Sequence, residues 1–319
     1  MKSLFVVAAL LASATAFADD EPANTSEIVI PGVDDVPDQS EPAPAEPAPV
    51  EPGEMPTPVK ARLMNPQPAR SVPRPRPVVD DGDGRLEKKE DTVAGGTHWR
   101  IKTGAGAVHV WVPPGYDRAT AGTVIYVHGY WTDADGAWRE HNLARQFRAS
   151  HQNALFIVPD APSSNEDSVK WPALKDLRRA IARANIKMPD GPTIVMGHSG
   201  AFRTVMQWVD HKLVQQIILL DAMYAGERAF DNFIDSGKRA DQHKLVVVAA
   251  GTAQSSESFA KKYKFAVARE KMPGDYAGFT KRQRGAKLLY IRSQYEHMQI
   301  VTSGKVIPVL LRLTPLKAL

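Results

Sequence analysis

The sequence predicts an α/β fold in which a mostly parallel central sheet carries helices on both faces. Short apolar runs rich in β-branched residues recur along the C-terminal part of the chain, at residues 123–127, 154–159 and 245–249. Segments with helical spacing, such as residues 137–150 and 173–184, separate them and are long enough to be crossover helices. Runs that are apolar throughout are typical of strands buried on both faces, as in a parallel sheet between two helical layers.

The elements of this fold follow one another from about Ala94 onward. Two short strands come first, at residues 99–102 and 107–113, and a turn containing two glycines joins them. The remaining expected strands are residues 193–196, 216–220 and 287–291, and the remaining expected helices are residues 201–211, 230–234, 258–267 and 305–313. We therefore expect one domain over residues 94–319, with no internal repeat.

The first 18 residues have the pattern of a secretory signal peptide. Lys2 provides a short basic region, residues 4–14 are apolar, and Ala16-Phe17-Ala18 has the small-x-small form of a cleavage site. The alternative is a membrane anchor, but the apolar stretch is shorter than the roughly 20 residues that a spanning helix needs. We expect cleavage near Ala18 and a periplasmic or secreted protein.

Residues 19–93 predict a disordered, proline-rich linker. Fourteen of the 25 prolines lie between residues 31 and 77, and proline fixes φ and removes a backbone donor. Glutamates dominate the first half of this segment and arginines the second. A solvated spacer is the simplest interpretation, and a weak electrostatic contact of the basic half with a membrane or cell wall is the alternative.

The composition excludes several classes of function. The chain has 319 residues and a net charge of +4, without any run of five Lys or Arg, so nothing indicates a nucleic-acid partner. It contains no cysteine, which rules out disulfides, thiolate metal ligands and a cysteine nucleophile. We expect a monomer without a metal site.

A candidate nucleophile follows the expected strand at residues 193–196. Residues 197–201 read Gly-His-Ser-Gly-Ala and precede an expected helix. In a nucleophile elbow the serine projects from a tight turn, and the residues two before and two after it must be small. Gly197 meets this requirement, and Ala201 replaces the more usual glycine. We expect Ser199 to be the nucleophile; the alternative is a plain turn between strand and helix.

The loop after residues 123–127 is the expected partner of this serine. Acyl-transfer sites stabilise the oxyanion with two backbone N–H groups, one following the nucleophile and one from such a loop. These are the N–H groups of Gly200 and Tyr130. We expect His128 to brace the loop. Candidate pocket residues are His128, Trp131, His198 and Tyr224, although aromatic residues at such positions, Trp138 and Trp171 included, more often belong to the core.

An acid and a base follow two further strands. Asp221 stands directly after residues 216–220, where a carboxylate needs a partner and is placed to orient a histidine. Glu257 is the alternative acid, and a helix N-cap is the alternative role of Asp221. His297 lies in the loop after the last strand and is the expected base; a surface-loop histidine is its alternative interpretation. The order Ser199, Asp221, His297 is that of one class of catalytic triad.

With these motifs, residues 96–319 resemble the α/β-hydrolase superfamily. Residues 110–116, 127–130 and 197–200 are similar to its strand before the oxyanion loop, its His-Gly motif and its elbow. The resemblance implies the α/β-hydrolase fold and a cofactor-free Ser-His-Asp hydrolase. Ala201 departs mildly from the family pattern, and the acid lies one strand earlier than in most members, as in some lipase-like members.

The predicted activity is hydrolysis of an ester or amide bond through an acyl-enzyme intermediate. We expect a small-molecule or cell-envelope acyl substrate, because no long insertion suggests a large lid. Two alternatives remain. In the first, the domain is a non-catalytic cell-envelope binding protein on a hydrolase scaffold. In the second, it is an acyltransferase that uses the same triad.

Overall fold

The structure, a computed structural model, describes residues 86–319. The predicted signal peptide, and the predicted linker up to residue 85, lie outside the described residues. Within residues 86–319, no helix combines the length and the apolar character needed to cross a membrane.

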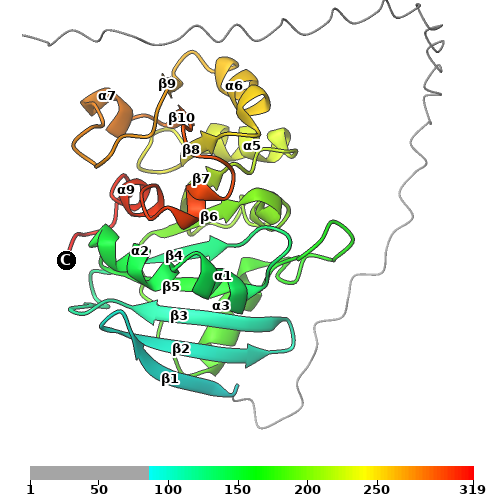
Figure 1. The fold of residues 1–319 in the computed structure, drawn as a ribbon, viewed down its shortest axis with the longest axis vertical. Coiled ribbons are helices and arrows are strands. Elements are labelled where there is room, and N and C mark those ends of the chain that lie inside the picture. The colour runs from blue at the N-terminus through cyan, green and yellow to red at the C-terminus, as the bar shows by residue number, and fades with distance from the viewer. Residues whose placement is uncertain (1–85) are drawn as a thin grey trace, which may run out of the picture. The chain divides into compact units, whose positions relative to one another are not determined.

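The predicted α/β fold with a mostly parallel sheet is confirmed (Figure 1). Ten strands form one sheet in the order β1-β2-β3-β5-β4-β6-β7-β8-β10-β9. Antiparallel pairing is confined to one side of the sheet, from β1 to the β3–β5 pair, and all other neighbours are parallel. The strands are β1 (Lys88–Val93), β2 (Gly96–Thr103), β3 (Gly106–Val112), β4 (Gly122–Val127), β5 (Ala154–Pro159), β6 (Thr193–His198), β7 (Val214–Leu220), β8 (Lys244–Ala249), β9 (Val267–Arg269) and β10 (Leu288–Arg292).

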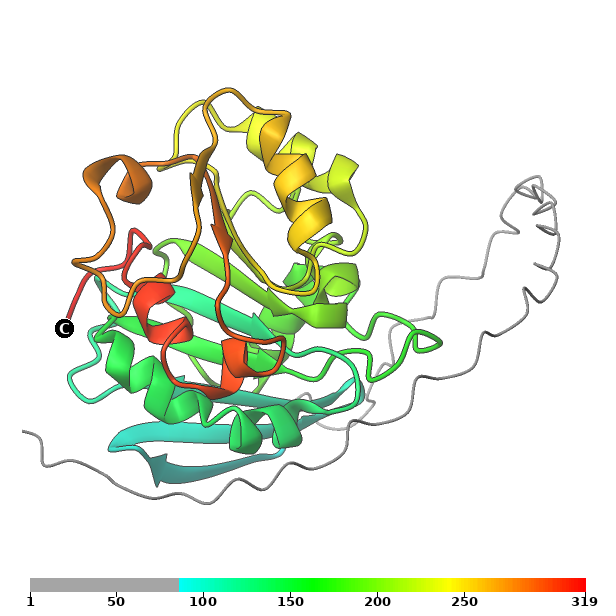
Figure 2. The ribbon, with the colours of Figure 1, turned by 45° about the horizontal axis from the view of Figure 1, so that its top comes forward.

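Helices cover both faces of the sheet, as Figure 2 shows from a second direction. Successive side chains of a strand point to opposite faces of the sheet and so belong to two apolar clusters. In β4, Ile125 and Val127 pack on one face, and Val124 and Tyr126 pack on the other. The first face is covered by α3 (Leu174–Arg183), α4 (Phe202–Val205), α5 (Glu227–Ser236) and α6 (Ala253–Lys261). The second is covered by α1 (Ala134–Glu140), α2 (Leu143–Ser150), α8 (Gln299–Thr302) and α9 (Ile307–Leu311). A short helix, α7 (Lys281–Arg284), precedes β10.

The fold begins before the predicted boundary at Ala94. Strand β1 pairs along its whole length with β2, from Lys88 opposite Ile101 to Val93 opposite Gly96. Five of its six side chains are exposed, so the strand has no apolar pattern that sequence analysis can detect. Charged residues are typical of an edge strand because they discourage pairing with another chain.

Three predicted helices differ from the observed ones. The helix expected at 137–150 is two helices, because Asn142 adopts a left-handed conformation (φ 51°) between α1 and α2. The helix expected at 201–211 is regular only over α4, after a 3-10 turn at Ser199–Ala201, and continues as turns. The helix expected at 258–267 begins and ends earlier, as α6, because the chain then enters the short edge strand β9.

Candidate active site

Ser199 occupies a strained turn between β6 and α4. Its backbone is left-handed (φ 53°), a conformation that is uncommon for a residue with a side chain. A Cβ at Gly197 would lie 2.8 Å from Cγ2 of Val205 and 3.3 Å from Cβ of Ala201. Strand and helix therefore approach so closely that Gly197 must lack a side chain, whereas the methyl group of Ala201 fits. This is the geometry expected of a nucleophile elbow.

Asp221 follows the neighbouring strand and is completely buried. Its carboxylate accepts hydrogen bonds from the N–H groups of Ala250 (3.0 Å), Gly251 (3.0 Å) and Thr252 (2.8 Å) and from Oγ1 of Thr252 (2.7 Å). Its fifth partner is Nδ1 of His297, 2.7 Å from Oδ2. Burial acts to raise the pKa of Asp221, but the hydrogen bonds from His297 and Thr252 outweigh it and hold that pKa well below its usual range.

The other candidate acid, Glu257, has different surroundings. Glu257 is half-buried on α6 and pairs with Lys261 at 2.6 Å, which lowers the pKa of its carboxyl. It does not contact His297 in the structure. Asp221 does not begin a helix of its own; from the end of the neighbouring strand it holds N–H groups just before α6. Sequence reasoning missed Ala250, Gly251 and Thr252 as partners of Asp221, because no local pattern connects them with a residue about 30 positions earlier.

His297 presents one ring nitrogen to Asp221 and leaves the other without a partner among residues 86–319. Because Asp221 is ionised, Nδ1 carries the proton and Nε2 is the basic nitrogen. The ring of His198 lies behind it, with centroids 4.6 Å apart, and His198 Nε2 donates to the carbonyl oxygen of His297 at 3.3 Å. Burial, helped by the neighbouring His297, lowers the pKa of His198 to about 3, so this second ring stays neutral.

Ser199 does not hydrogen-bond to His297 among the residues that the structure describes. Its hydroxyl interacts with the phenol of Tyr224 instead, which lowers the pKa of that phenol against the larger, raising effect of burial. Catalytic hydrogen bonds of this kind are often long before a substrate binds. The structure thus brings Asp221 and His297 together and places Ser199 on the next strand end, beside Tyr224.

The loop after β4 packs directly on the serine. A Cβ at Gly129 would lie 2.7 Å from Cβ of Ser199, and the ring of Tyr130 occupies the space that a side chain at Gly200 would need. Within residues 86–319, the backbone N–H of Tyr130 donates to no acceptor. The two residues predicted to supply the oxyanion hole, Tyr130 and Gly200, are therefore in contact beside Ser199.

The four candidate pocket residues separate into two pairs. His128 and His198 are buried, and their place in a pocket stays a prediction. His128 braces the loop: Nδ1 donates to the carbonyl oxygen of Gly129 (2.7 Å), and Nε2 accepts from the N–H of Ala161 (2.9 Å). Trp131 is 93% exposed and Tyr224 is 54% exposed, so both are accessible to a ligand.

The other two candidate aromatic residues serve the fold. Trp171 is buried in the apolar cluster beneath α3, and its carbonyl oxygen accepts from Nε1 of Trp208. Trp138 stacks on the rings of His98 and His109, far along the chain from the serine turn. Among the described residues, no group of three or more His, Asp or Glu side chains is arranged to hold a metal ion.

Comparisons with known proteins support the resemblance predicted from the motifs. Residues 124–305, more than half of the chain, match the alpha/beta hydrolase family. No curated protein matches the sequence.

The solved structures that the chain resembles have low identity and TM-scores below 0.5. An S-formylglutathione hydrolase from Agrobacterium tumefaciens is 11% identical, with 72% of this chain and 96% of that chain covered and a TM-score of 0.42. One from Staphylococcus aureus is 11% identical, with 72% and 98% covered and a TM-score of 0.46. A feruloyl esterase module from Clostridium thermocellum is 13% identical, with 70% and 87% covered and a TM-score of 0.45. The family match and the sheet topology together place this chain in the alpha/beta hydrolase family.

Proposed function

We propose that this hydrolase-family protein cleaves an ester or amide bond with Ser199 as nucleophile, His297 as base and Asp221 as the orienting acid. One observation carries the proposal: a buried, fivefold hydrogen-bonded Asp221 contacts Nδ1 of His297 and leaves Nε2 free at the end of the sheet where Ser199 stands. That arrangement makes His297 a base with a fixed tautomer.

The reaction starts with proton transfer. His297 Nε2 takes the proton of Ser199 as Oγ attacks the acyl carbon, and the ionised Asp221 stabilises the resulting imidazolium. Before this step the Ser199 hydroxyl must come within hydrogen-bonding reach of His297 Nε2. Asp221 keeps its negative charge throughout, because its hydrogen bonds favour the ionised carboxylate.

The oxyanion and the leaving group complete the cycle. The N–H groups of Tyr130 and Gly200 hold the oxyanion, and each such donor contributes about a hundred- to a thousandfold in rate. The protonated His297 then gives its proton to the leaving alcohol or amine. Water, deprotonated by the same imidazole, attacks the acyl-Ser199 ester and releases the acid.

The substrate carries an apolar acyl or aryl group of modest size. Five large apolar side chains are exposed in the described part of the chain, and three of them adjoin the proposed triad and oxyanion loop. Trp131 follows Tyr130, Tyr224 interacts with Ser199, and Met298 follows His297. Exposed apolar residues gathered around a reactive group are typical of a binding surface. Export, predicted from the first 18 residues, fits a cell-envelope ester as substrate.

A fluorophosphonate probe tests the proposal. We expect it to label the mature protein covalently, and we expect Ser199→Ala to abolish labelling and turnover of p-nitrophenyl esters. Ser303→Ala is a matched control, because the Ser303 hydroxyl accepts only from the N–H of Lys305. An unlabelled wild-type protein, or equal labelling of Ser199→Ala, would mean that the domain is a binding protein rather than a serine hydrolase. Product analysis with an added alcohol or amine separates hydrolysis from acyl transfer.

A further inference from the structure

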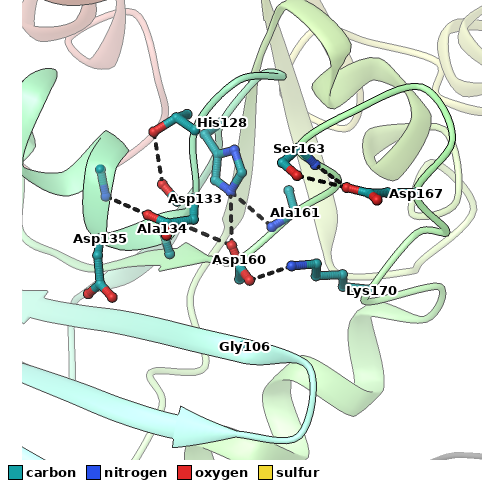
Figure 3. Close-up of polar contacts among 12 residues, drawn as sticks. Gly106, His128, Asp133, Ala134, Asp135, Asp160, Ala161, Ser163, Asp167 and Lys170 are labelled. Carbon is teal, nitrogen blue, oxygen red and sulfur yellow. Dashed lines mark hydrogen bonds and ion pairs between the residues drawn. The ribbon is translucent and has the colours of Figure 1, made fainter.

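We propose that Asp160 is a positioning residue for the oxyanion loop, residues 128–134: its carboxylate hydrogen-bonds to the last residue of the loop and packs beside the first. This inference rests on the proposed function, because it assigns Asp160 to the loop that carries the Tyr130 N–H. Asp160 directly follows β5 and is 6% exposed. Figure 3 shows its carboxylate at the centre of a polar network built from several separate segments.

One carboxylate oxygen reaches both ends of the loop. Oδ1 of Asp160 accepts from the N–H of Ala134 (3.1 Å), the first residue of α1, and lies 3.4 Å from Nε2 of His128, the first residue after β4. Tyr130 and Trp131 lie between these two points. The Asp160 carboxylate therefore fixes the end of the loop, and the N–H of the next residue, Ala161, fixes its beginning (Figure 3).

The chain of contacts continues to the nucleophile. His128 Nδ1 donates to the carbonyl oxygen of Gly129 at 2.7 Å, and Gly129 packs against Cβ of Ser199. His128 Nε2 also accepts from the N–H of Ala161, which ties the imidazole to the segment that carries Asp160. Displacement of Asp160 thus reaches Ser199 through two intervening residues, His128 and Gly129, without Asp160 touching the substrate.

The other oxygen fixes the carboxylate itself. Oδ2 of Asp160 bonds to Nζ of Lys170 at 2.6 Å, and the backbone N–H of Asp160 donates to the carbonyl oxygen of Ala107 at 2.9 Å. The turn at Gly106 packs so closely that a side chain there would overlap the carboxylate. Burial acts to raise the pKa of Asp160, but His128 and Lys170 outweigh it and lower that pKa, so the group is ionised at neutral pH.

The position of the oxyanion loop matters to catalysis because its N–H donors act only at short range. Oxyanion donors must lie about 2.7 to 3.1 Å from the developing charge, and a displacement of about 1 Å costs on the order of a hundredfold in rate. Other contacts anchor the loop as well: the N–H of Trp131 donates to the carbonyl oxygen of Ser163, Asp133 caps α1, and the Tyr130 hydroxyl accepts from Nη1 of Arg203 at 3.2 Å, but Asp160 holds the N–H of Ala134. Loss of Asp160 should therefore lower kcat and leave ground-state binding nearly unchanged.

Steady-state kinetics of three variants test this role, with p-nitrophenyl acetate as substrate. We expect Asp160→Ala to lower kcat by about 10- to 100-fold with KM within about threefold, and to slow fluorophosphonate labelling in parallel. Asp160→Asn keeps an oxygen for the N–H of Ala134 and should lose only about three- to tenfold. Lys170→Met leaves the bond from Ala134 to Oδ1 in place but removes the partner of Oδ2, so its kcat should fall less than that of Asp160→Ala.

Asp117→Ala is the control. Its carboxylate accepts from the backbone N–H of Ala119 (3.0 Å) and from Oγ1 of Thr120 (2.8 Å), not from residues 128–134. Its kcat should therefore stay within about threefold of wild type.

Asp167→Ala is an intermediate case, because its carboxylate accepts from the N–H groups of Ser163 and Ser164 in the segment that follows Asp160 (Figure 3). Because Ser163 in turn anchors the N–H of Trp131, we expect the kcat of this variant to fall less than that of Asp160→Ala, which removes a direct hydrogen bond to the loop.

The outcomes separate this inference from the proposed function. If wild type hydrolyses the ester through Ser199 but folded Asp160→Ala keeps kcat within threefold, Asp160 serves the fold only and the inference is wrong. If Asp160→Ala does not fold, Asp160→Asn decides in the same way: an unchanged kcat overturns the inference, and a fall in kcat at constant KM supports it. A wild-type protein without Ser199-dependent turnover refutes the proposed function itself.

Discussion

Two of the regions in which histidine contacts aspartate have reversed burial. At the candidate site, Asp221 is fully buried and the side chain of His297 is 36% exposed. On the antiparallel side of the sheet, the side chains of His109 and His98 are 4% and 7% exposed, whereas their partners Asp135 and Asp91 are 37% and 64% exposed. The same pair of residue types is therefore built in two opposite ways.

The second region uses all of its ring nitrogens. His98 Nδ1 bonds to Asp91 (2.6 Å), His98 Nε2 to His109 Nδ1 (2.9 Å), and His109 Nε2 to Asp135 (2.9 Å). Trp138 stacks on both rings, and Arg100 holds Asp135 through two hydrogen bonds of 2.6 Å. This His98–His109 cluster fastens β1, β2, β3 and α1 together and offers no nitrogen to a substrate.

The difference shows what separates a base from a structural histidine. A buried carboxylate with strong donors stays ionised and fixes the tautomer of an imidazole whose second nitrogen faces outward. A buried imidazole loses its ability to carry charge: burial, together with the nearby His98, lowers the pKa of His109 to about 4. Contact between histidine and aspartate is therefore not itself a sign of catalysis; the exposed partner must be the histidine.

The largest expected contrast comes from neutralising one aspartate in each region. Asp221→Asn should lower kcat by about 10³- to 10⁴-fold, because an amide no longer fixes the reactive tautomer of His297. Asp91→Asn, in the His98–His109 cluster, should leave kcat within about twofold. Ester hydrolysis and circular dichroism of both variants measure this. Similar losses in two folded proteins would show that the reversed burial has no functional meaning.

The two regions should also differ in how acid affects them. The pKa of His109 falls from 6.5 to about 4 on folding, so below pH 6.5 the unfolded chain binds more protons and stability is lost as the pH drops toward 4. His109 alone should contribute about 3 kcal/mol to that loss. His141 and His198, with pKa values lowered chiefly by burial to about 4 and about 3, act in the same direction.

Urea unfolding between pH 7 and pH 4 measures this acid sensitivity. His109→Gln should be less stable than wild type at pH 7 by about 1 to 3 kcal/mol, because His98 and Asp135 lose a partner. Its stability should then fall less steeply with acid. If the free energy of unfolding of this variant fell with acid as steeply as that of wild type, His109 would not be a source of the acid sensitivity.

Exposed apolar residues are a further difference between the candidate site and the His98–His109 cluster. Trp131→Ala should raise KM about five- to tenfold for aryl or long-chain esters and change it little for acetate, because one aromatic contact contributes about 1 kcal/mol. Phe265→Ala, which removes an exposed aromatic side chain away from Ser199, should change KM for neither ester. Equal effects of both variants on all esters would argue against a substrate surface at Trp131.

The smallest effect is expected from the other candidate acid. Glu257→Gln should leave kcat within twofold and change the free energy of unfolding by less than about 0.5 kcal/mol, because its exposed pair with Lys261 is one helical turn apart. A loss of kcat comparable to that of Asp221→Asn would instead make Glu257 the acid.

Much of the fold could be predicted from the sequence because its signals are local. Apolar runs without alternation indicate strands covered on both faces, and β4, β5, β6 and β8 are buried along their whole length. Candidate site residues could be predicted for the same reason. Carboxyl ends of parallel strands meet at one edge of a sheet, so Ser199, Asp221 and His297, each following a strand, had to emerge on the same side.

Long-range hydrogen bonds were decided only by the tertiary structure. The N–H groups that hold Asp221 come from residues 250–252, and Asp160 joins His128 to Ala134 from more than 25 positions away. No spacing rule connects such groups, because their distance depends on how strands pair and not on sequence separation. The reversed burial of the two histidine–aspartate regions has the same origin. By itself the sequence determined which residues follow each strand; packing decided which of those side chains is enclosed and which faces outward.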